Sequence, residues 1–491
     1  MSCDQDRARD DAGASDPVTR REFLKQSAGV ALASAFMPAA MAESRVDGAW
    51  TALNAVVASQ QLAPAQYPRT AIWGYNGMTP GPVLRLKQGE RLRVRLSNGL
   101  PGQDTTIHWH GVRLPIGMDG VPNVTQPPVG PGQVFDYEFV AQDAGTYWYH
   151  SQLLAYEQVA RGLHGALIVD EPVPFEVDRD LLWVIADWRL NRRAVLQDDF
   201  RDLHDLSHAG RLGSAITING RFAREVPLEV RAGERVRLRL VNASVARILG
   251  LRFADHDPTA VAFDGQPVAP HALGEGGLVL GPGMRADLIL DCAGRPCGRH
   301  VIDDAYYPGD RTAVTEIVYR DEAPLRRAFG PPPALPANPV PEPDVARAER
   351  RELVLQGGAM GSLREARVGG KLLPIGQMLR EHHLGWAING AAGKGQGDAP
   401  LLSLKRGGHY VIKIRNDTGW DHPMHLHGHV FRLITRNGNP APYRPWGDTV
   451  IVGRRQSIEI ALVADNPGLW MLQCQTLLHQ EGGLAGFVRV D

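Results

Sequence analysis

The amino-acid sequence predicts an all-β protein made of three β-sandwich domains. One pattern occurs three times, starting near Pro82, Val226 and Pro400: an apolar strand, a turn containing glycine, and a second strand of alternating apolar and polar residues. There is little helical periodicity, and 54 glycines and 36 prolines suit a fold with many turns. With 491 residues, the chain is also too long for a single hydrophobic core.

Residues 1–42 predict a twin-arginine export signal. The pair Arg20-Arg21 precedes a short apolar stretch, and small residues from Ala40 to Ala42 suit cleavage. The alternative is a chance basic pair before an apolar stretch. The signal implies recognition by the twin-arginine export machinery, a periplasmic location and a mature chain that starts near Glu43. No apolar run is long enough to cross a bilayer, so we expect no membrane span.

Changes in composition predict the domain boundaries. The first domain is expected over 43–175, where it closes with the sequence VDEPVPFEVDRD, and the second over 176–325. Prolines concentrate within 326–350, which predicts an extended linker. The third domain is then expected over 351–491, and each domain has an ordinary size.

Net charge and cysteine content narrow the possible functions. A formal net charge of −1 provides no field that would attract nucleic acid, so we expect no nucleic-acid partner. Cys3 lies in the export signal. Cys292 and Cys297 are close enough to pair in an oxidising compartment or to remain two thiols on a turn. Cys474 is left unpaired in an exported protein, and metal ligation is a leading explanation.

Histidines gather in four short segments: TIHWHGV, TYWYHSQ with His150, WDHPMHLHGHVF and QCQTLLHQEGG. Residues two apart on a strand share a face. His108 therefore shares a face with His110, and His425 shares one with His427. The combination of all four segments is much stronger than any one of them, because a single H-x-H on a strand is often only polar surface.

The last segment serves two different sites. Gln473 and Gln475 share one face of a strand, whereas Cys474 points to the opposite side. If His422 lies on the cysteine side, then His422, Cys474 and His479 can converge. Two imidazoles and one thiolate are the ligand set of a blue-copper centre.

Leu484, ten residues after the cysteine, stands where a weak axial ligand would be. Leucine cannot coordinate a metal, and the lack of an axial donor should raise the reduction potential. A further stretch, DDFRDLHDLSHAG, predicts a loop or a short helix in the second domain. Five further histidines are interpreted as structural or surface residues: His164, His204, His208, His409 and His429.

These segments resemble the multicopper oxidase family, a group with three cupredoxin domains that includes laccases and bacterial copper-resistance oxidases. The resemblance covers nearly the whole mature chain and implies three cupredoxin-like Greek-key β-sandwich domains. The family builds a type 1 copper site and a trinuclear cluster from four histidine motifs. H-W-H-G and H-P-x-H-x-H are present in full, whereas H-x-H and H-C-H-x3-H carry glutamines at three histidine places.

The resemblance implies a complete type 1 copper site, with His422, Cys474 and His479 as ligands and Leu484 at the axial place. It also implies ligands for the cluster: His108 and His425 for type 2 copper; His110 and His150, with Gln475, for one type 3 copper; His427, with Gln152 and Gln473, for the other. An amide oxygen is a weak neutral donor, so the type 3 pair is expected to bind copper poorly. The glutamines are expected instead to hydrogen-bond to one another or to water.

Two acids have roles implied by the resemblance. Asp119, in GMDGVP, matches an acid near the cluster that takes part in proton delivery, and its alternative is a turn residue before Gly120. Asp448, in WGDTVIV, is expected near the type 1 site, where it orients a ligand histidine, and its alternative is a strand-capping carboxylate.

The resemblance implies an oxidoreductase of laccase-like type. A small reducing substrate, either a phenol or a metal ion, would give single electrons at the type 1 copper, and Cys474 would pass them to dioxygen at an altered cluster. Two alternatives stay open at this stage. One is a blue-copper electron-transfer or copper-binding protein that does not reduce oxygen. The other is a copper-free periplasmic scaffold.

Overall fold

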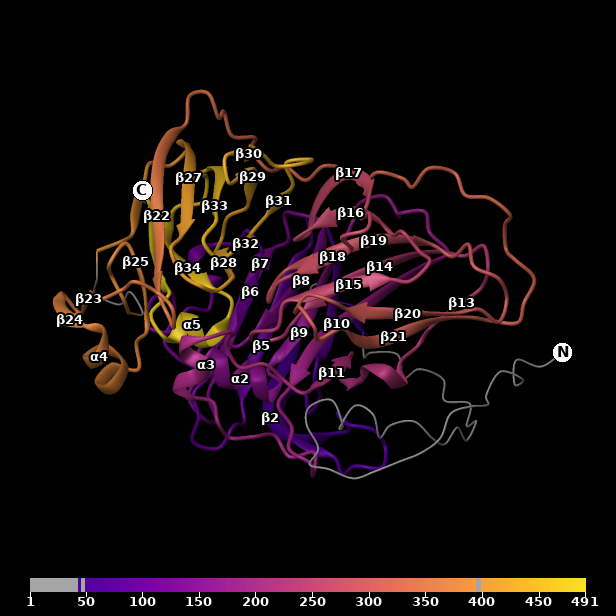
Figure 1. The fold of residues 1–491 in the computed structure, drawn as a ribbon, viewed down its shortest axis with the longest axis horizontal. Helices are drawn as coiled ribbons and strands as arrows, with labels where there is room; N and C mark the ends of the chain where they lie inside the picture. Colours follow the sequence, from indigo (N-terminus) through magenta and orange to yellow (C-terminus); the bar gives the residue numbers. More distant parts are fainter. Residues whose placement is uncertain (1–42, 46–48, 394–398) are drawn as a thin grey trace.

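The computed structural model describes residues 43–45, 49–393 and 399–491, and it confirms the all-β prediction. Strands form three units, each with a pair of packed sheets. We call them the first unit (β1 to β9), the middle unit (β10 to β21) and the third unit (β22 to β35). Figure 1 shows the third unit in orange and yellow beside the indigo first unit, with the middle unit on the other side. The predicted export signal, 1–42, lies outside the described residues.

The first unit pairs a five-stranded sheet with a four-stranded sheet. The five-stranded sheet has the order β1 (Glu43–Arg45), β4 (Gly81–Lys87), β9 (His164–Asp170), β8 (Gly145–His150) and β6 (His108–His110). The other has the order β3 (Thr70–Tyr75), β2 (Thr51–Gln60), β5 (Arg91–Asn98) and β7 (Val134–Val140). In β5, Leu92, Val94 and Leu96 are buried, as the alternating pattern predicts.

The middle unit contains a larger sheet. Its seven strands have the order β12 (Arg221–Phe222), β11 (Ala215–Ile218), β10 (Arg179–Trp188), β14 (Arg235–Asn242), β19 (Arg285–Asp291), β16 (Thr259–Phe263) and β17 (Gln266–Ala272). The facing sheet has the order β13 (Leu228–Val230), β21 (Thr312–Tyr319), β20 (Arg299–Asp304), β15 (Leu249–Phe253) and β18 (Leu278–Leu280).

The third unit repeats this arrangement. One sheet has the order β25 (Trp386–Ile388), β22 (Glu349–Gly357), β27 (His409–Asn416), β33 (Ser457–Val463), β29 (Phe431–Arg436) and β30 (Asn439–Pro440), with β31 (Trp446–Gly447) also paired to β29. The other has the order β26 (Leu402–Leu404), β35 (Ala485–Val490), β34 (Gly468–Cys474), β28 (His422–Leu426) and β32 (Thr449–Val452). A hairpin of β23 (Glu365–Val368) and β24 (Lys371–Pro374) lies apart from both.

Helices are short in the described residues. They are α2 (Ala155–Arg161), α3 (Leu203–Ser207), α4 (Ile375–Gln377), α5 (Leu477–Glu481), the 3-10 turns η1 (Ile116–Met118) and η2 (Ala223–Glu225), and the π turn η3 (Met378–His382). For DDFRDLHDLSHAG the sequence predicts a loop or a short helix, and the structure has the short helix α3 there. It packs with α2 and α5 along one edge of the molecule, so each unit contributes one helix to this group (Figure 1).

Apolar and polar residues alternate in β14 as they do in β5, but in β14 the polar residues are buried too. Nearly all of β14 is buried, including Arg237 and Arg239. The reason is that β14 lies against the first unit, where Arg237 forms ion pairs with Glu171 (2.7 Å) and with Asp287 of its own unit (2.6 Å). The polar face of this strand is therefore an interface rather than a solvated surface.

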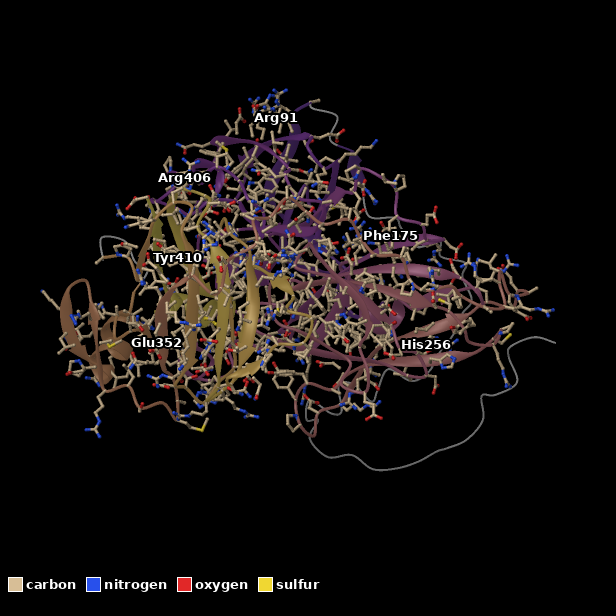
Figure 2. All side chains as sticks on the ribbon, turned by 90° about the horizontal axis from the view of Figure 1, so that it is seen from above. Arg91, Phe175, His256, Glu352, Arg406 and Tyr410 are labelled. Carbon is tan, nitrogen blue, oxygen red and sulfur yellow. The ribbon has the colours of Figure 1, made fainter. Side chains whose placement is uncertain are left out.

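The three units share apolar cores. One cluster of buried residues runs from the first unit into the third, including Trp109 and Trp470. Another joins all three units, including Trp148, Trp188 and Leu477. Figure 2 shows Arg91 of the first unit at the top, Glu352 of the third unit on the left and His256 of the middle unit on the right, with side chains filling the space between them.

The structure bears on two further expectations, the pairing of Cys292 with Cys297 and the absence of a membrane span. Cys292 is buried and has a free thiol, so it is not paired with Cys297, and burial raises the pKa of its thiol to about 12. In the part of the chain that the structure describes, no helix is both long and apolar enough to cross a membrane. The domain boundaries remain a prediction.

Candidate metal centres

Three donor atoms converge in the third unit. β28 begins at His422, the neighbouring β34 ends at Cys474, and α5 carries His479. Sγ of Cys474 lies 3.5 Å from Nδ1 of His422 and 3.9 Å from Nδ1 of His479, and the two Nδ1 atoms are 3.2 Å apart. We call this set the first centre. A point equidistant from the three atoms lies about 2 Å from each, close to the length of a metal–imidazole bond.

The outer nitrogens of both imidazoles are held by hydrogen bonds. Nε2 of His422 lies 2.8 Å from Oγ1 of Thr418, and Nε2 of His479 donates to the backbone carbonyl of His208 at 2.7 Å. A proton on Nε2 leaves the lone pair on Nδ1, which faces Cys474. The surroundings therefore set the tautomer that a metal requires.

The first centre is apolar and fully buried. Burial raises the pKa of Cys474 to about 12 and lowers the pKa of His479 to about 3. The ring of Trp386 packs on His479 with centroids 4.3 Å apart. Leu484 is buried, and its backbone joins the other two residues: its N–H donates to His479 and its carbonyl accepts from Cys474. That Leu484 is an axial neighbour of copper stays a prediction.

Residues around α3 cover the first centre, and the sequence did not predict this covering. His204 is exposed, as expected, but His208 is only partly so, and its carbonyl contacts His479. The rings of His204 and His208 stack with centroids 3.9 Å apart. No sequence signal could reveal this, because a backbone carbonyl supplies the contact.

A second centre lies where β6 and β8 of the first unit approach β28 and β34 of the third. Nε2 of His108 lies 3.3 Å from Nε2 of His425. Nδ1 of His110 lies 3.4 Å from Nε2 of His150. The structure thus brings together two pairs of imidazole nitrogens. The pair of His108 and His425 joins the first unit to the third. The fifth histidine, His427, stacks on His108 with centroids 3.8 Å apart.

Asp119 holds two of these histidines from outside. Its backbone carbonyl lies 2.9 Å and its Oδ1 3.2 Å from Nδ1 of His108, and its Oδ2 lies 2.9 Å from Nδ1 of His427. Both rings therefore present Nε2 to the interior of the centre. Burial acts to raise the pKa of Asp119, but His427 and His108 outweigh it and hold the pKa below its usual value.

Asp448 also holds two histidines, but the prediction that it lies near the first centre is wrong. Its Oδ1 lies 3.2 Å from Nε2 of His110 and 3.2 Å from Nδ1 of His425, both in the second centre. The reason is the antiparallel register of β28 and β32, which places Thr449 opposite His425 and leaves His422 at the other end. The expected role, to orient a histidine, is retained at a different centre.

Three glutamines form a hydrogen-bonded chain beside these histidines, as expected. Nε2 of Gln152 donates to Oε1 of Gln473 at 2.7 Å, and Nε2 of Gln473 donates to Oε1 of Gln475 at 3.1 Å. Within the described residues, three buried atoms in or beside this row of glutamines have no hydrogen-bond partner: Oε1 of Gln152, Nε2 of Gln475 and Nε2 of His427. The pocket is polar but carries no unpaired charge of its own.

All five histidines of the second centre are neutral at neutral pH. Burial lowers the pKa of each ring, and neighbouring imidazoles lower it further: His108, His110, His150, His425 and His427. Neutral imidazoles are metal ligands, whereas protonated ones are not. Both centres therefore hold their nitrogens in the form that binds metal.

The other histidines lie outside the two centres. His164 and His429 are buried, and His409 accepts a hydrogen bond from the backbone of Asp344. On α3, Asp202, His204 and Asp205 bring donor atoms within 4.8 Å of one another. Those carboxylates are already engaged, because Asp202 caps the helix and Asp205 pairs with an arginine.

Comparisons with known proteins agree with the resemblance seen in the sequence. Models of the multicopper oxidase family match residues 56–173, 179–304 and 373–491. Multicopper oxidase MmcO of Mycobacterium tuberculosis is 26% identical, with 95% of each chain covered. Copper resistance protein A of Escherichia coli is 27% identical, over 85% of this chain and 89% of the relative.

Solved structures give the same answer. A multi-copper oxidase from Pseudomonas thermotolerans is 32% identical and superimposes with a TM-score of 0.78, covering 92% of this chain and all of that one. Lac15 from a marine microbial metagenome is 34% identical, with a TM-score of 0.70 and coverage of 90% and 100%. The likeness spans all three units.

Proposed function

This chain belongs to the multicopper oxidase family, and from that premise we propose that it is a copper-dependent oxidase with an altered cluster. It would take single electrons from a small reducing substrate at the first centre and deliver them to dioxygen at the second. The observation that carries this proposal is the first centre: one thiolate and two imidazoles, buried and arranged around a point at metal-bond distance from each.

The chain's own residues supply the connection between the centres. Cys474 faces the first centre, while its sequence neighbours Gln473 and Gln475 face the second. The two centres are thus separated by the backbone of a single strand end. When bound, copper supplies reversible one-electron transfer at the first centre and dioxygen chemistry at the second. Asp119 is hydrogen-bonded to two histidines, and its low pKa keeps it ionised, so these contacts support a role in orienting the rings. Its part in proton delivery stays a prediction.

The residues of the second centre fit two copper ions better than three. His108 with His425, and His110 with His150, each offer two imidazole nitrogens. The remaining position offers His427 and amides that already bond to one another. An imidazole with amide oxygens is a poor copper site, so the residues do not fit a third ion there. We therefore expect three coppers per chain, with one at the first centre.

The residues around α3 that cover the first centre limit how a substrate can approach it. Because His479 is buried and its Nε2 is bonded to His208, a donor would meet the surface around α3 rather than the imidazole itself. This suits one-electron donors that need no inner contact with the metal. Phenols, manganous ion and cuprous ion remain the proposed substrate classes.

A second candidate function is a blue-copper electron-transfer protein that does not reduce oxygen. The specific observation in its favour is the glutamine chain, which fills the place of three histidines. The intact donor triangle of the first centre weighs against the third possibility, a copper-free scaffold.

A copper count on the folded protein, with optical and paramagnetic-resonance spectra, separates these functions. Oxygen uptake would be followed with a phenolic dye, manganous ion and cuprous ion in turn. We expect a blue protein with three coppers that consumes oxygen, and a Cys474→Ser variant that does not. A blue protein without oxygen uptake supports the second candidate. A colourless protein without copper overturns both.

Periplasmic location is part of the same proposal and has its own test. It rests on the signal predicted over residues 1–42. Replacing Arg20 and Arg21 by lysines should retain the chain in the cytoplasm, measured by cell fractionation. Unchanged export would show that another signal is used.

A further inference from the structure

The middle unit supplies none of the histidines of either centre, yet one of its side chains lies against the second centre. We propose that Arg285 is a positioning residue for that centre, acting through Asp448 to fix the rings of His110 and His425. The proposal rests on the proposed function only in taking the second centre as a metal site. What it adds is a role for the middle unit.

Arg285 begins β19 and is completely buried. Its guanidinium binds Asp448 with two hydrogen bonds, NH1 to Oδ1 at 2.9 Å and NH2 to Oδ2 at 2.5 Å. Two more of its donors are used, with Nε bonded to the carbonyl of Thr146 and NH1 also to the carbonyl of Gly283. A bidentate contact fixes the plane of the carboxylate as well as its position.

The carboxylate in turn fixes two rings. Oδ1 of Asp448 accepts a hydrogen bond from Thr449, whose Oγ1 therefore faces the rings as an acceptor, 3.0 Å from Nε2 of His110 and 3.1 Å from Nδ1 of His425. Nδ1 of His425 also lies 3.0 Å from the backbone carbonyl of Asp448. Because only acceptors face these nitrogens, both carry protons. The lone pairs then lie on Nδ1 of His110 and Nε2 of His425, the atoms that face the interior.

The backbone around the pair is shaped to keep it in place. Asp264 of the middle unit accepts hydrogen bonds from the backbone N–H groups of Asp448 and Thr449. Gly111, directly after His110, has φ +82°, and a Cβ there would lie 2.2 Å from NH2 of Arg285 and 2.3 Å from Oδ2 of Asp448. The glycine of the H-W-H-G motif thus leaves room for this ion pair.

A buried ion pair between units could also be merely structural, since such pairs are weak evidence of any special role. The two readings differ in what a substitution would change. A positioning residue affects the metal at the second centre and spares the first. A structural residue lowers the stability of the whole protein and affects both centres together.

The test compares Arg285→Gln and the milder Arg285→Lys with Arg237→Gln. Arg237 is the matched control because it is also buried and doubly ion-paired at the contact with the first unit, but its partners contact no histidine of either centre. Chelator competition on the copper-loaded protein measures affinity at each centre. We expect Arg285→Gln to weaken copper at the second centre about 10- to 100-fold, Arg285→Lys to weaken it less, and blue absorption to persist in both.

Two outcomes overturn the proposal: unchanged copper affinity at the second centre, or equal loss at both centres as in Arg237→Gln. A second measurement does not depend on copper. In the metal-free protein, histidine-selective nitrogen resonance should show His110 protonated on Nε2 and His425 on Nδ1. Arg285→Gln should mix the tautomers of His110, and those of His425 less, because the backbone carbonyl of Asp448 also holds His425. If the second centre of the unaltered protein binds no copper, the proposed function fails, but the resonance measurement still tests the role of Arg285. Unmixed tautomers in Arg285→Gln would refute that role.

Discussion

Gly111→Ala is the substitution for which the structure gives the clearest magnitude. Two costs add. A left-handed φ of +82° costs an L-residue about 1–2 kcal/mol. The new Cβ must also displace the buried pair of Arg285 and Asp448, and a broken buried pair costs about 3–5 kcal/mol. We expect the free energy of unfolding to fall by about 4–7 kcal/mol.

Gly89→Ala is the matched control. Gly89 has φ +86°, in the same first unit, and a Cβ there would have no atom within 4 Å. Both substitutions reduce the entropy of the unfolded chain equally, so this term cancels between them. The difference, about 3–5 kcal/mol, isolates the contact with the ion pair. For a cooperative unit of about 150–250 residues, it corresponds to an unfolding temperature lower by about 6–20 °C.

The assay is calorimetric unfolding of the metal-free proteins, which separates packing from metal binding. Gly111→Ala should unfold well below Gly89→Ala, and Gly89→Ala should lie within a few degrees of the unaltered protein. If the two variants unfold at the same temperature, then the space beside Gly111 is not filled as the structure indicates, and the reasoning fails.

Three further predictions concern the centres themselves. Cys474→Ser should abolish the blue absorption and leave two coppers bound, by optical and resonance spectra; loss of all copper would show that the centres are not independent. Replacing Gln152, Gln473 and Gln475 by histidines should raise the copper count from three to four per chain, and an unchanged count would mean that the glutamines are not what excludes the fourth ion. Burial holds the pKa of His479 at about 3, whereas an unfolded histidine titrates near about 6.5, so the unfolded chain binds more protons between these values. Metal-free protein should therefore lose stability as pH falls from about 6.5 towards 3, and a flat unfolding temperature from pH 7 to 5 would contradict this.

The alternation of strands was enough to predict the faces of the two centres. A period of two placed Cys474 opposite Gln473 and Gln475, and the structure has this arrangement. It also grouped His108 with His110. These inferences succeed because the geometry of a strand is local and needs no knowledge of the rest of the fold.

What the sequence could not supply is non-local. Asp448 was expected at the wrong centre, because the register of β28 and β32 decides which histidine it meets. The carbonyl of His208 has no side-chain signature. Arg285 lies in no histidine motif, and only the docking of the middle unit brings it to Asp448. The buried arginines of β14 likewise look like a solvated face until their acidic partners are known.

The contacts of Arg285 have a consequence for the order in which the protein is assembled. This one guanidinium bonds to Thr146 of the first unit, Gly283 of its own and Asp448 of the third. The first centre takes all three donor atoms from the third unit, and the middle unit adds the carbonyl of His208 that orients His479. The second centre takes its histidines from the first and third units, and by our proposal it also depends on the middle unit through Arg285. We therefore expect copper uptake at the second centre only in a chain whose three units have docked.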